Sequence, residues 1–215
     1  MTWWTRTGRH SPVGSQLAIW GGLAVSQVDG PGSRVVLHTA GCSVGCPGCF
    51  NPHTHDQAAP GVTWWQPSEL ARQVYDVAVQ TGAKGVTISG GEPTDQMEAL
   101  VSLLRHLRER GFDSIVLFSG RKVEYLRAHR GFAKSVEQES LVDVLIDGPY
   151  VESKPEFEWN RGSANQRILP LTSRHDVEEF RSREVEIKVD SGGRVVLLGF
   201  PDQSMLDAVS GRECV

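Results

Sequence analysis

The feature that most constrains the fold of this chain is a regular spacing of short apolar runs. Residues 85–89 (GVTIS), 114–118 (SIVLF) and 142–146 (VDVLI) are such runs, and they begin about 29 residues apart. Runs of this kind are typical of strands buried on both faces of a parallel sheet. The spacing matches the length of one strand and one helix with their loops. It therefore predicts repeated βα units, which a further run at 35–39 precedes.

The segments between these runs have the periodicity of amphipathic helices. Residues 68–80 carry apolar side chains on one face, and a stronger pattern follows Thr94 and Asp95. Either residue could cap this second helix, Asp95 with the Glu of a capping box three residues later, and Gly111 is expected to end it. Residues 122–129 predict a shorter helix. Alternating strands and helices predict an α/β fold whose parallel sheet is closed or partly closed as a barrel.

The last part of the chain has a different pattern. Residues 184–189 and 194–199 flank the turn-forming sequence DSGG, which predicts a β-hairpin. The chain has 215 residues, enough for one well-buried domain and hardly enough for two. We therefore expect a single domain over residues 1–215, with a core at about 17–170 and a hairpin and tail at 171–215.

Charge and hydropathy narrow the classes of function. The formal net charge is −4 and the pI is near 6.0, which gives no electrostatic case for binding nucleic acid or an anionic membrane. No run approaches the roughly 20 apolar residues that cross a bilayer, and the first ten residues lack the pattern of a signal peptide. We expect a cytoplasmic protein, in which thiols stay reduced.

Three of the four cysteines lie within eight residues, in the sequence Cys42-Ser-Val-Gly-Cys46-Pro-Gly-Cys49. The intervening glycines allow the tight turns that wrap a metal centre. A structural zinc site normally takes four ligands, typically from two separated pairs, but the fourth cysteine, Cys214, is far along the chain. Three thiolates would leave one iron of an iron–sulfur cluster without a protein ligand. The spacing therefore predicts a metal site, disfavours a closed four-thiolate zinc site and makes a cluster with an open iron one candidate.

Two alternatives to the cluster remain, a zinc ion and a redox-active thiol group. Three thiolates could bind a catalytic zinc ion, and His53 or His55 would then be expected to join them. We expect both histidines to be solvated loop residues instead. Phe50, directly after the third cysteine, is expected to pack either near the cluster and its ligand or in the core.

A second motif, Gly90-Gly91-Glu92-Pro93, directly follows the predicted strand 85–89. Barrels of parallel strands place their chemistry at the carboxyl ends of the strands. Glycines there let a ligand approach the backbone, and the carboxylate of Glu92 could pair with an ammonium group. The motif is therefore expected to bind a ligand at the same edge as the cysteines.

Four other polar residues are candidates for the site. Ser119 and Asp147 follow two predicted strands, which places them at the same edge of the sheet. An apolar run followed by Asp-Gly is also an ordinary strand-to-turn sequence, so Asp147 has a second, structural interpretation. Asn165 and Arg167 lie in a predicted loop with no structural demand for them, and they are candidates for contact with a substrate or partner.

Taken together, the cysteine spacing and the GGEP motif resemble the radical S-adenosylmethionine (SAM) superfamily. The segment from Val28 to Pro52 resembles the glycyl-radical-enzyme activases. Residues 143–150 and 161–168 resemble the activating proteins of anaerobic ribonucleoside-triphosphate reductases. Two features depart from that pattern: Arg121 stands where an aromatic residue is common, and the tail after residue 170 is longer than in compact members.

The resemblance implies a partial (βα)6 barrel of the radical SAM type. It implies a [4Fe–4S] cluster on Cys42, Cys46 and Cys49, and SAM held through its amino group by the GGEP motif, with Asp147 near its ribose or a cation. It also implies a glycyl radical enzyme as partner and a flavodoxin- or ferredoxin-like electron donor. The alternative is a radical SAM enzyme for a small molecule or peptide of a biosynthetic pathway, such as a 7-carboxy-7-deazaguanine synthase-like enzyme. A non-enzymatic zinc or iron–sulfur module is a third candidate, which the GGEP motif disfavours.

Overall fold

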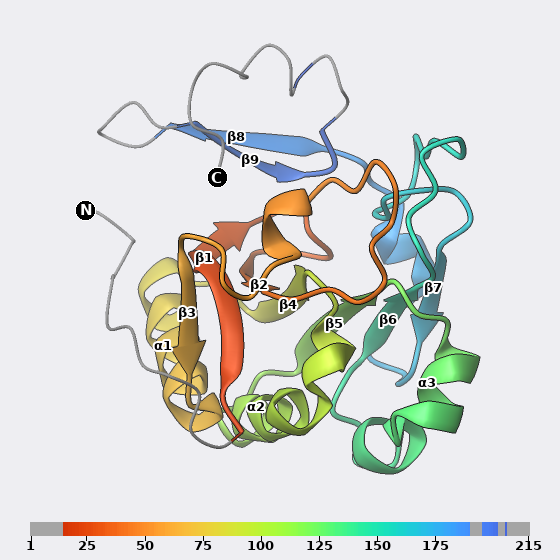
Figure 1. The fold of residues 1–215 in the computed structure, drawn as a ribbon. Helices are drawn as coiled ribbons and strands as arrows, with labels where there is room; N and C mark the ends of the chain where they lie inside the picture. Colours follow the sequence, from red (N-terminus) through yellow and green to blue (C-terminus); the bar gives the residue numbers. More distant parts are fainter. Residues whose placement is uncertain (1–14, 190–194, 202–204, 206–215) are drawn as a thin grey trace.

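A seven-stranded mixed sheet is the framework of the computed structural model, which describes residues 15–189, 195–201 and 205 (Figure 1). The strands lie in the order β3-β1-β2-β4-β5-β6-β7. Strands β2, β4, β5 and β6 are parallel, and β1, β3 and β7 are antiparallel to their neighbours. The bounds are β1 Leu17–Ser26, β2 Arg34–Thr39, β3 Val62–Trp65, β4 Gly85–Gly90, β5 Ser114–Ser119, β6 Val144–Asp147 and β7 Arg167–Pro170.

Helices cover one face of this sheet, where α1 and α2 lie side by side (Figure 1). The α-helices are α1 Pro67–Thr81, α2 Met97–Glu109 and α3 Val123–His129, and the short helices are η1 Pro52–Thr54, η2 Pro93–Gln96, η3 Ala133–Glu137 and η4 Val177–Phe180. The apolar face of α2 packs with the strands in one continuous core. Burial of these periodic apolar residues stabilises the helices.

The predicted α/β class, partial barrel and C-terminal hairpin are confirmed. The parallel part is smaller than six βα units, because it has four strands and an antiparallel strand on each side. The chain reverses after β6, and β7 runs back along it. The sheet is therefore an open, partial barrel.

The predicted cap of α2 is wrong. This helix begins at Met97 without a side-chain cap, and Glu92 caps the preceding η2 by accepting a hydrogen bond from the Thr94 amide. Asp95 instead accepts hydrogen bonds from the amide and hydroxyl of Ser43, at 2.8 and 2.6 Å. A partner 52 residues away in the sequence thus replaces the local one.

The hairpin consists of β8 (Val185–Val189) and β9 (Val195–Gly199), paired in antiparallel register. Its predicted turn at 190–193 lies outside the described residues, as does Cys214. The hairpin lies across the end of the sheet, on the side of the segment that follows β2 (Figure 1). None of the described helices is long and apolar enough to cross a membrane.

Arg34, at the start of β2, is fully buried and links three parallel strands. It donates to the Thr87 hydroxyl of β4 at 2.8 Å, and to the hydroxyl and carbonyl of Ser114 in β5 at 2.8 and 3.2 Å. Two further bonds go to the carbonyls of Pro31 and Val86. Burial lowers the pKa of the guanidinium to about 10, so it stays charged at neutral pH. One side chain thus aligns the beginnings of β2, β4 and β5.

Replacing Arg34 by leucine should lower the free energy of unfolding by about 3 kcal/mol, because several buried acceptors would lose their donor. Urea denaturation of the reconstituted protein measures this change. Arg72→Leu is the matched control, since Arg72 is half exposed and its ion pairs with Glu69 and Asp76 are surface pairs, which contribute little to stability. Equal decreases in the free energy of unfolding in the two variants would contradict the role of Arg34 in linking the strands.

Candidate active site

The cysteine loop follows β2, includes η1 and closes on itself at the end of η1. The Gly41 amide donates to the Thr54 carbonyl at 2.8 Å, and the Cys42 amide donates to the His55 carbonyl at 3.1 Å. Gly41 has a φ of +98°, which favours glycine. These bonds bring the two ends of the loop together, so that the three cysteines project from one closed loop.

All three thiols are partly exposed and line the same pocket. The Asn51 amide donates to Cys49 Sγ at 3.4 Å, and the backbone of Tyr150 contacts Cys46 in the same way. Burial raises the pKa of the Cys46 and Cys49 thiols, while these amides lower it. Iron binding would favour the thiolates, and amide donors to sulfur are a means by which proteins tune iron–sulfur clusters.

A polynuclear cluster and a single ion place different demands on three thiols. Zinc requires all its ligand atoms within about 2.0–2.3 Å of one centre, whereas each thiolate of an iron–sulfur cluster binds a different iron. Three cysteines on one closed loop therefore suit a cluster whose fourth iron stays open.

The GGEP motif lies directly against the cysteine loop. The Gly91 amide donates to the Thr39 carbonyl and the Glu92 amide to the Gly41 carbonyl, both at 2.8 Å. A Cβ atom on Gly91 would lie 2.3 Å from the Gly41 oxygen and 3.0 Å from the Thr54 oxygen. Only glycine fits this contact, so the two motifs form one backbone unit.

Glu92 is fully buried, and its carboxylate joins two loops. It accepts hydrogen bonds from the amide and hydroxyl of Thr94 at 3.0 and 2.6 Å. From the end of β5 it accepts the Ser119 hydroxyl at 2.9 Å and the Gly120 amide at 2.8 Å. Burial raises the pKa of Glu92, although these donors oppose it. Holding the loops is thus its observed role, and pairing with an ammonium group stays a prediction.

Arg121, the residue that departs from the activase pattern, contacts the cysteine loop. It donates to the Ser43 hydroxyl at 2.6 Å and pairs with Asp95 at 3.0 Å. Arg130 pairs with the same Asp95 oxygen at 2.9 Å. Burial raises the pKa of Asp95, but the hydrogen bonds from Ser43 and the hydrogen bond and charge of Arg121 outweigh it, so the pKa is lowered. The Arg121–Asp95 ion pair therefore connects the loop after β5 to Ser43 of the cysteine loop.

The structure brings most of the predicted site residues into one pocket. Its lining includes Cys42, Cys46, Cys49, Phe50, Gly90, Gly91, Glu92 and Ser119. Pro93 is buried next to the pocket at the start of η2. Their assignment to a cluster and a ligand stays a prediction, but their common location does not depend on it.

Asp147, Asn165 and Arg167 are not in that lining. Asp147 is buried, accepts the Val123 amide at 2.7 Å and pairs with Arg167 at 2.5 Å. Arg167 also pairs with Glu124 at 2.9 Å. The side-chain amide nitrogen (Nδ2) of Asn165 donates to the Pro149 carbonyl at 2.8 Å. Each of these side chains thus has a structural role, and contacts with SAM or a partner stay predictions.

The two loop histidines are closer to the site than expected for solvated residues. His55 lines the cysteine pocket. His53 is exposed, but its ring lies against Trp20, with 4.1 Å between the ring centroids.

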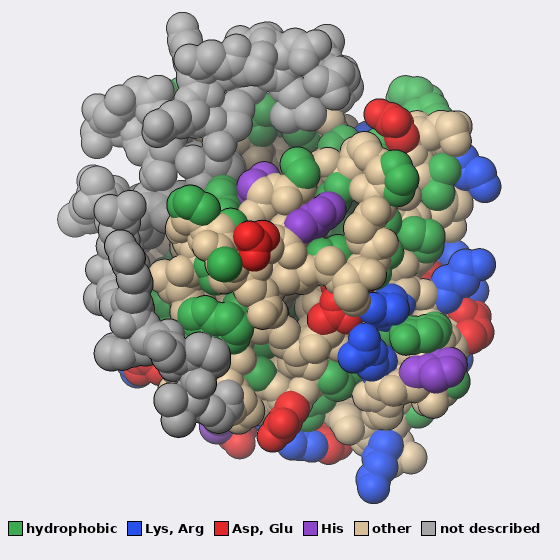
Figure 2. Space-filling view, viewed as in Figure 1, with side chains coloured by type: hydrophobic (Ala, Val, Ile, Leu, Met, Phe, Trp, Pro, Cys, Tyr) green, Lys and Arg blue, Asp and Glu red, His purple; other side chains and the backbone are tan. Residues whose placement is uncertain are grey.

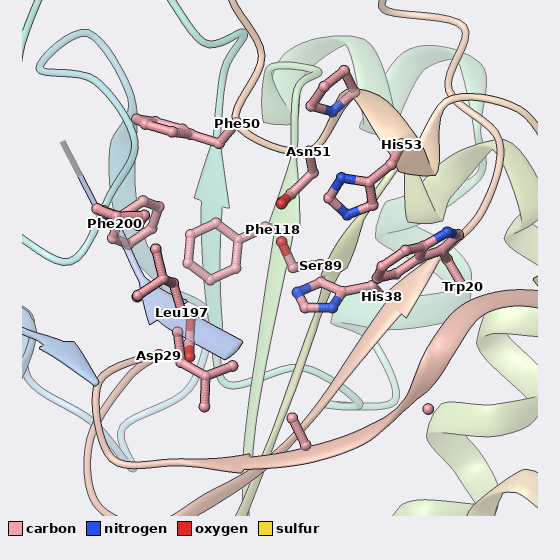
Figure 3. Close-up of a pocket in the computed structure, with 16 residues that line it drawn as sticks. Trp20, Asp29, His38, Phe50, Asn51, His53, Ser89, Phe118, Leu197 and Phe200 are labelled. Atoms are coloured by element: carbon pink, nitrogen blue, oxygen red, sulfur yellow. The ribbon is translucent and has the colours of Figure 1, made fainter. Parts of the chain in front are cut away.

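An inner cavity of about 270 Å³, which no sequence motif predicts, lies next to the cysteine pocket. Figure 3 shows His38, Ser89 and Phe118 lining it from β2, β4 and β5. Trp20 of β1 and Asn51 of the cysteine loop also line it. The alternation of side chains along a strand predicts which residues share a face of the sheet, but it does not predict which face lines a cavity.

The face seen in Figure 2 has its Lys and Arg side chains mainly on the side of α3, mixed with acidic groups. Histidine side chains lie near the middle of this face and also on the side of α3, and apolar side chains are spread over the face. Burial lowers the pKa of His38 to about 4, so this cavity histidine is neutral at physiological pH.

Comparison with known proteins gives a consistent result. A family model described as a 4Fe-4S single cluster domain matches residues 28–169, more than half of the chain. The anaerobic ribonucleoside-triphosphate reductase-activating protein of Enterobacteria phage T4 is 33% identical over 156 residues, which cover 69% of this chain and 93% of that protein. The chain belongs to this radical SAM family.

Further matches cover different shares of the proteins concerned. The protein of the same name from Escherichia coli K12 is 29% identical over 153 residues, covering 68% of this chain and 94% of the relative. The pyruvate formate-lyase-activating enzyme of Staphylococcus aureus is 36% identical over 157 residues, covering 68% and 58%. Among solved structures, QueE from Escherichia coli has a TM-score of 0.39 and 21% identity, covering 49% of this chain and 53% of that chain.

Replacing Gly91 by alanine should displace the cysteine loop, because the new methyl group would overlap the Gly41 carbonyl. We expect a loss of about 1–3 kcal/mol in unfolding free energy, as for overpacked sites, and loss of most bound iron after anaerobic reconstitution. Iron and sulfide analysis measures the second effect. Gly111→Ala is the control for iron content: its φ of +85° should make alanine destabilising there too, but a Cβ at this position meets no atom within 4 Å, so the iron content should stay full. Full iron content in Gly91→Ala would contradict the contact's importance.

Proposed function

We propose that this radical SAM enzyme activates a glycyl radical enzyme by abstracting a hydrogen atom from one of its glycines. The observation that carries the proposal is the junction of the cysteine loop and the GGEP motif beside an enclosed inner cavity. The first two elements suit a cluster with an open iron, and the cavity offers room for the group that loses its hydrogen.

Each part of the site has a role in this proposal. Cys42, Cys46 and Cys49 would hold three irons of a [4Fe–4S] cluster, and the backbone at Gly90–Glu92 would hold the amino group of SAM. When bound and reduced, the cluster would supply the single electron needed for reductive cleavage of SAM to methionine and a hydrogen-abstracting adenosyl group. Phe50 and Phe118 line the route between pocket and cavity, and exclude water.

The names of the relatives support the class of partner. Two proteins matched over 93% and 94% of their length are named for activating anaerobic ribonucleoside-triphosphate reductase. We therefore propose an anaerobic ribonucleotide reductase as the partner. A flavodoxin- or ferredoxin-like protein would supply the electron.

We also propose that the chain forms one radical SAM domain. Phe180 of η4 follows the predicted core segment 17–170 in the sequence, yet it packs with Val116 and Ile146 of the central strands. Residues of β9 line the inner cavity. The segment after β7 therefore shares the core and the site of the sheet.

The reconstituted enzyme, reduced with SAM and mixed with the anaerobic reductase of its own organism, should generate an organic radical on the reductase. Electron paramagnetic resonance detects this radical, and Cα-deuterated glycine in the reductase should transfer deuterium to 5′-deoxyadenosine. The matched control is a reductase whose radical-site glycine is replaced by alanine, which should give no signal.

A reductase that stays diamagnetic while the enzyme releases 5′-deoxyadenosine would contradict the proposed partner. That result would favour the alternative of a small-molecule or peptide substrate.

A further inference from the structure

The β8–β9 hairpin supplies one side of the inner cavity although it lies outside the part of the chain that the family model matches. That match ends at residue 169, whereas β9 spans Val195–Gly199. Leu197, Leu198, Gly199 and Phe200 all line the cavity. In Figure 3, Leu197 and Phe200 lie on the side of Phe118 opposite to His53 and Trp20. The hairpin is therefore an addition that reaches the site.

Specific contacts hold the hairpin against the beginning of the chain. The Gln27 amide donates to the Glu186 carboxylate at 3.3 Å, and the Lys188 ammonium group donates to the Val25 carbonyl. Gly199 has a φ of +86°, and a Cβ there would lie 2.5 Å from the Glu184 oxygen and 3.0 Å from Val28. The end of β9 is thus fixed closely over the loop after β1.

Phe200 stands between the inner cavity and an outer groove. Its ring centroid lies 6.1 Å from that of Phe50 and 6.0 Å from that of Phe118, and the Arg183 guanidinium lies 5.1 Å from it on the outer side. The groove, of about 610 Å³, shares Phe50, Phe200 and two prolines with the cavity. A ligand that passes from the groove to the cavity must therefore pass these rings.

The cavity offers no positive charge to a ligand. None of the described residues that line it is Lys or Arg, and burial lowers the pKa of His38 to about 4. The second lining histidine, His53, is exposed, and its pKa is lowered by partial desolvation and by the neighbouring His38 and His55. Its single carboxyl, Asp29, has a pKa raised by burial. An anionic group would lose its hydration there without a partner. The lining therefore favours an uncharged ligand.

We propose that the hairpin is a specificity element, with Phe200 and Leu197 forming the wall of a pocket that receives an uncharged, partly apolar segment of the substrate. This inference rests on the proposed function for the identity of the segment, which would be a neutral glycine-containing stretch of the partner. Backbone amides of such a stretch can bond to Asn51, Ser89 and the two neutral histidines, and the rings enclose the rest.

The first test measures binding of a matched pair of probes, neutral naphthalene-methanol and anionic naphthoate, to the reconstituted, SAM-bound and unreduced enzyme by fluorescence. We expect the neutral probe to bind about tenfold more tightly than the anion, because the anion gains no cation on burial. Phe200→Ala should weaken the neutral probe by about tenfold through lost apolar contact.

Two further variants distinguish loss of the pocket from misfolding of the hairpin. Leu197→Trp should block the pocket while the larger side chain preserves apolar packing. Phe200→Leu should restore most of the probe binding that is lost in Phe200→Ala. Ile187→Ala is the control, because Ile187 of β8 is 60% exposed and lines no described cavity. Equal affinity in wild type, Phe200→Ala and Leu197→Trp, or tighter binding of the anion, would overturn the proposal.

The second test measures deuterium transfer from the Cα-deuterated partner to 5′-deoxyadenosine. Phe200→Ala and Leu197→Trp should keep their iron content but lose at least about tenfold in deuterium transferred per 5′-deoxyadenosine released, a ratio that does not depend on the rate of SAM cleavage. Unchanged transfer in both variants would overturn the hairpin's role and leave the proposed function intact. No transfer in the wild type, with probe binding still dependent on Phe200, would overturn the proposed function alone.

Discussion

The site depends on one backbone contact, in which the loop after β4 lies directly on the loop that carries the cysteines. Gly91 permits this contact because it has no side chain, and Glu92 fixes it because its backbone amide donates a hydrogen bond to the Gly41 carbonyl. The buried Glu92 carboxylate then extends the connection to the end of β5. A cluster on the cysteines and a ligand on the GGEP backbone would therefore be placed relative to each other by the main chain, which is stiffer than any pair of side chains.

The parallel sheet provides the support for this contact. Arg34 aligns the beginnings of β2, β4 and β5, and the same strands end at the cysteine loop, the GGEP motif and Ser119. The carboxyl ends of parallel strands thus meet at one edge, as in other barrels. The antiparallel strands on either side leave this barrel open, and the hairpin covers part of the opening where it lines the inner cavity.

Sequence periodicity was sufficient to predict the four parallel strands, the main helices and the hairpin, because burial enforces those patterns locally. Motif spacing was sufficient to predict that the cysteines and the GGEP motif share a pocket. Long-range partners account for the failures: Asp95 binds Ser43 instead of capping α2, and Asp147 is engaged by Arg167 and the Val123 amide. The inner cavity was also missed, because His38, Phe118 and Phe200 meet only through strand curvature and the placement of β9.

The central claim is that the cysteine loop and the GGEP motif form one centre for reductive cleavage of SAM. The most direct measurement is 5′-deoxyadenosine released on reduction of the anaerobically reconstituted protein with SAM, related to the iron bound per chain. The account predicts about four irons per chain, as in a [4Fe–4S] cluster, and release of 5′-deoxyadenosine that is lost when Cys42, Cys46 or Cys49 is replaced by alanine. One zinc ion per chain, with no cleavage of SAM, would contradict it.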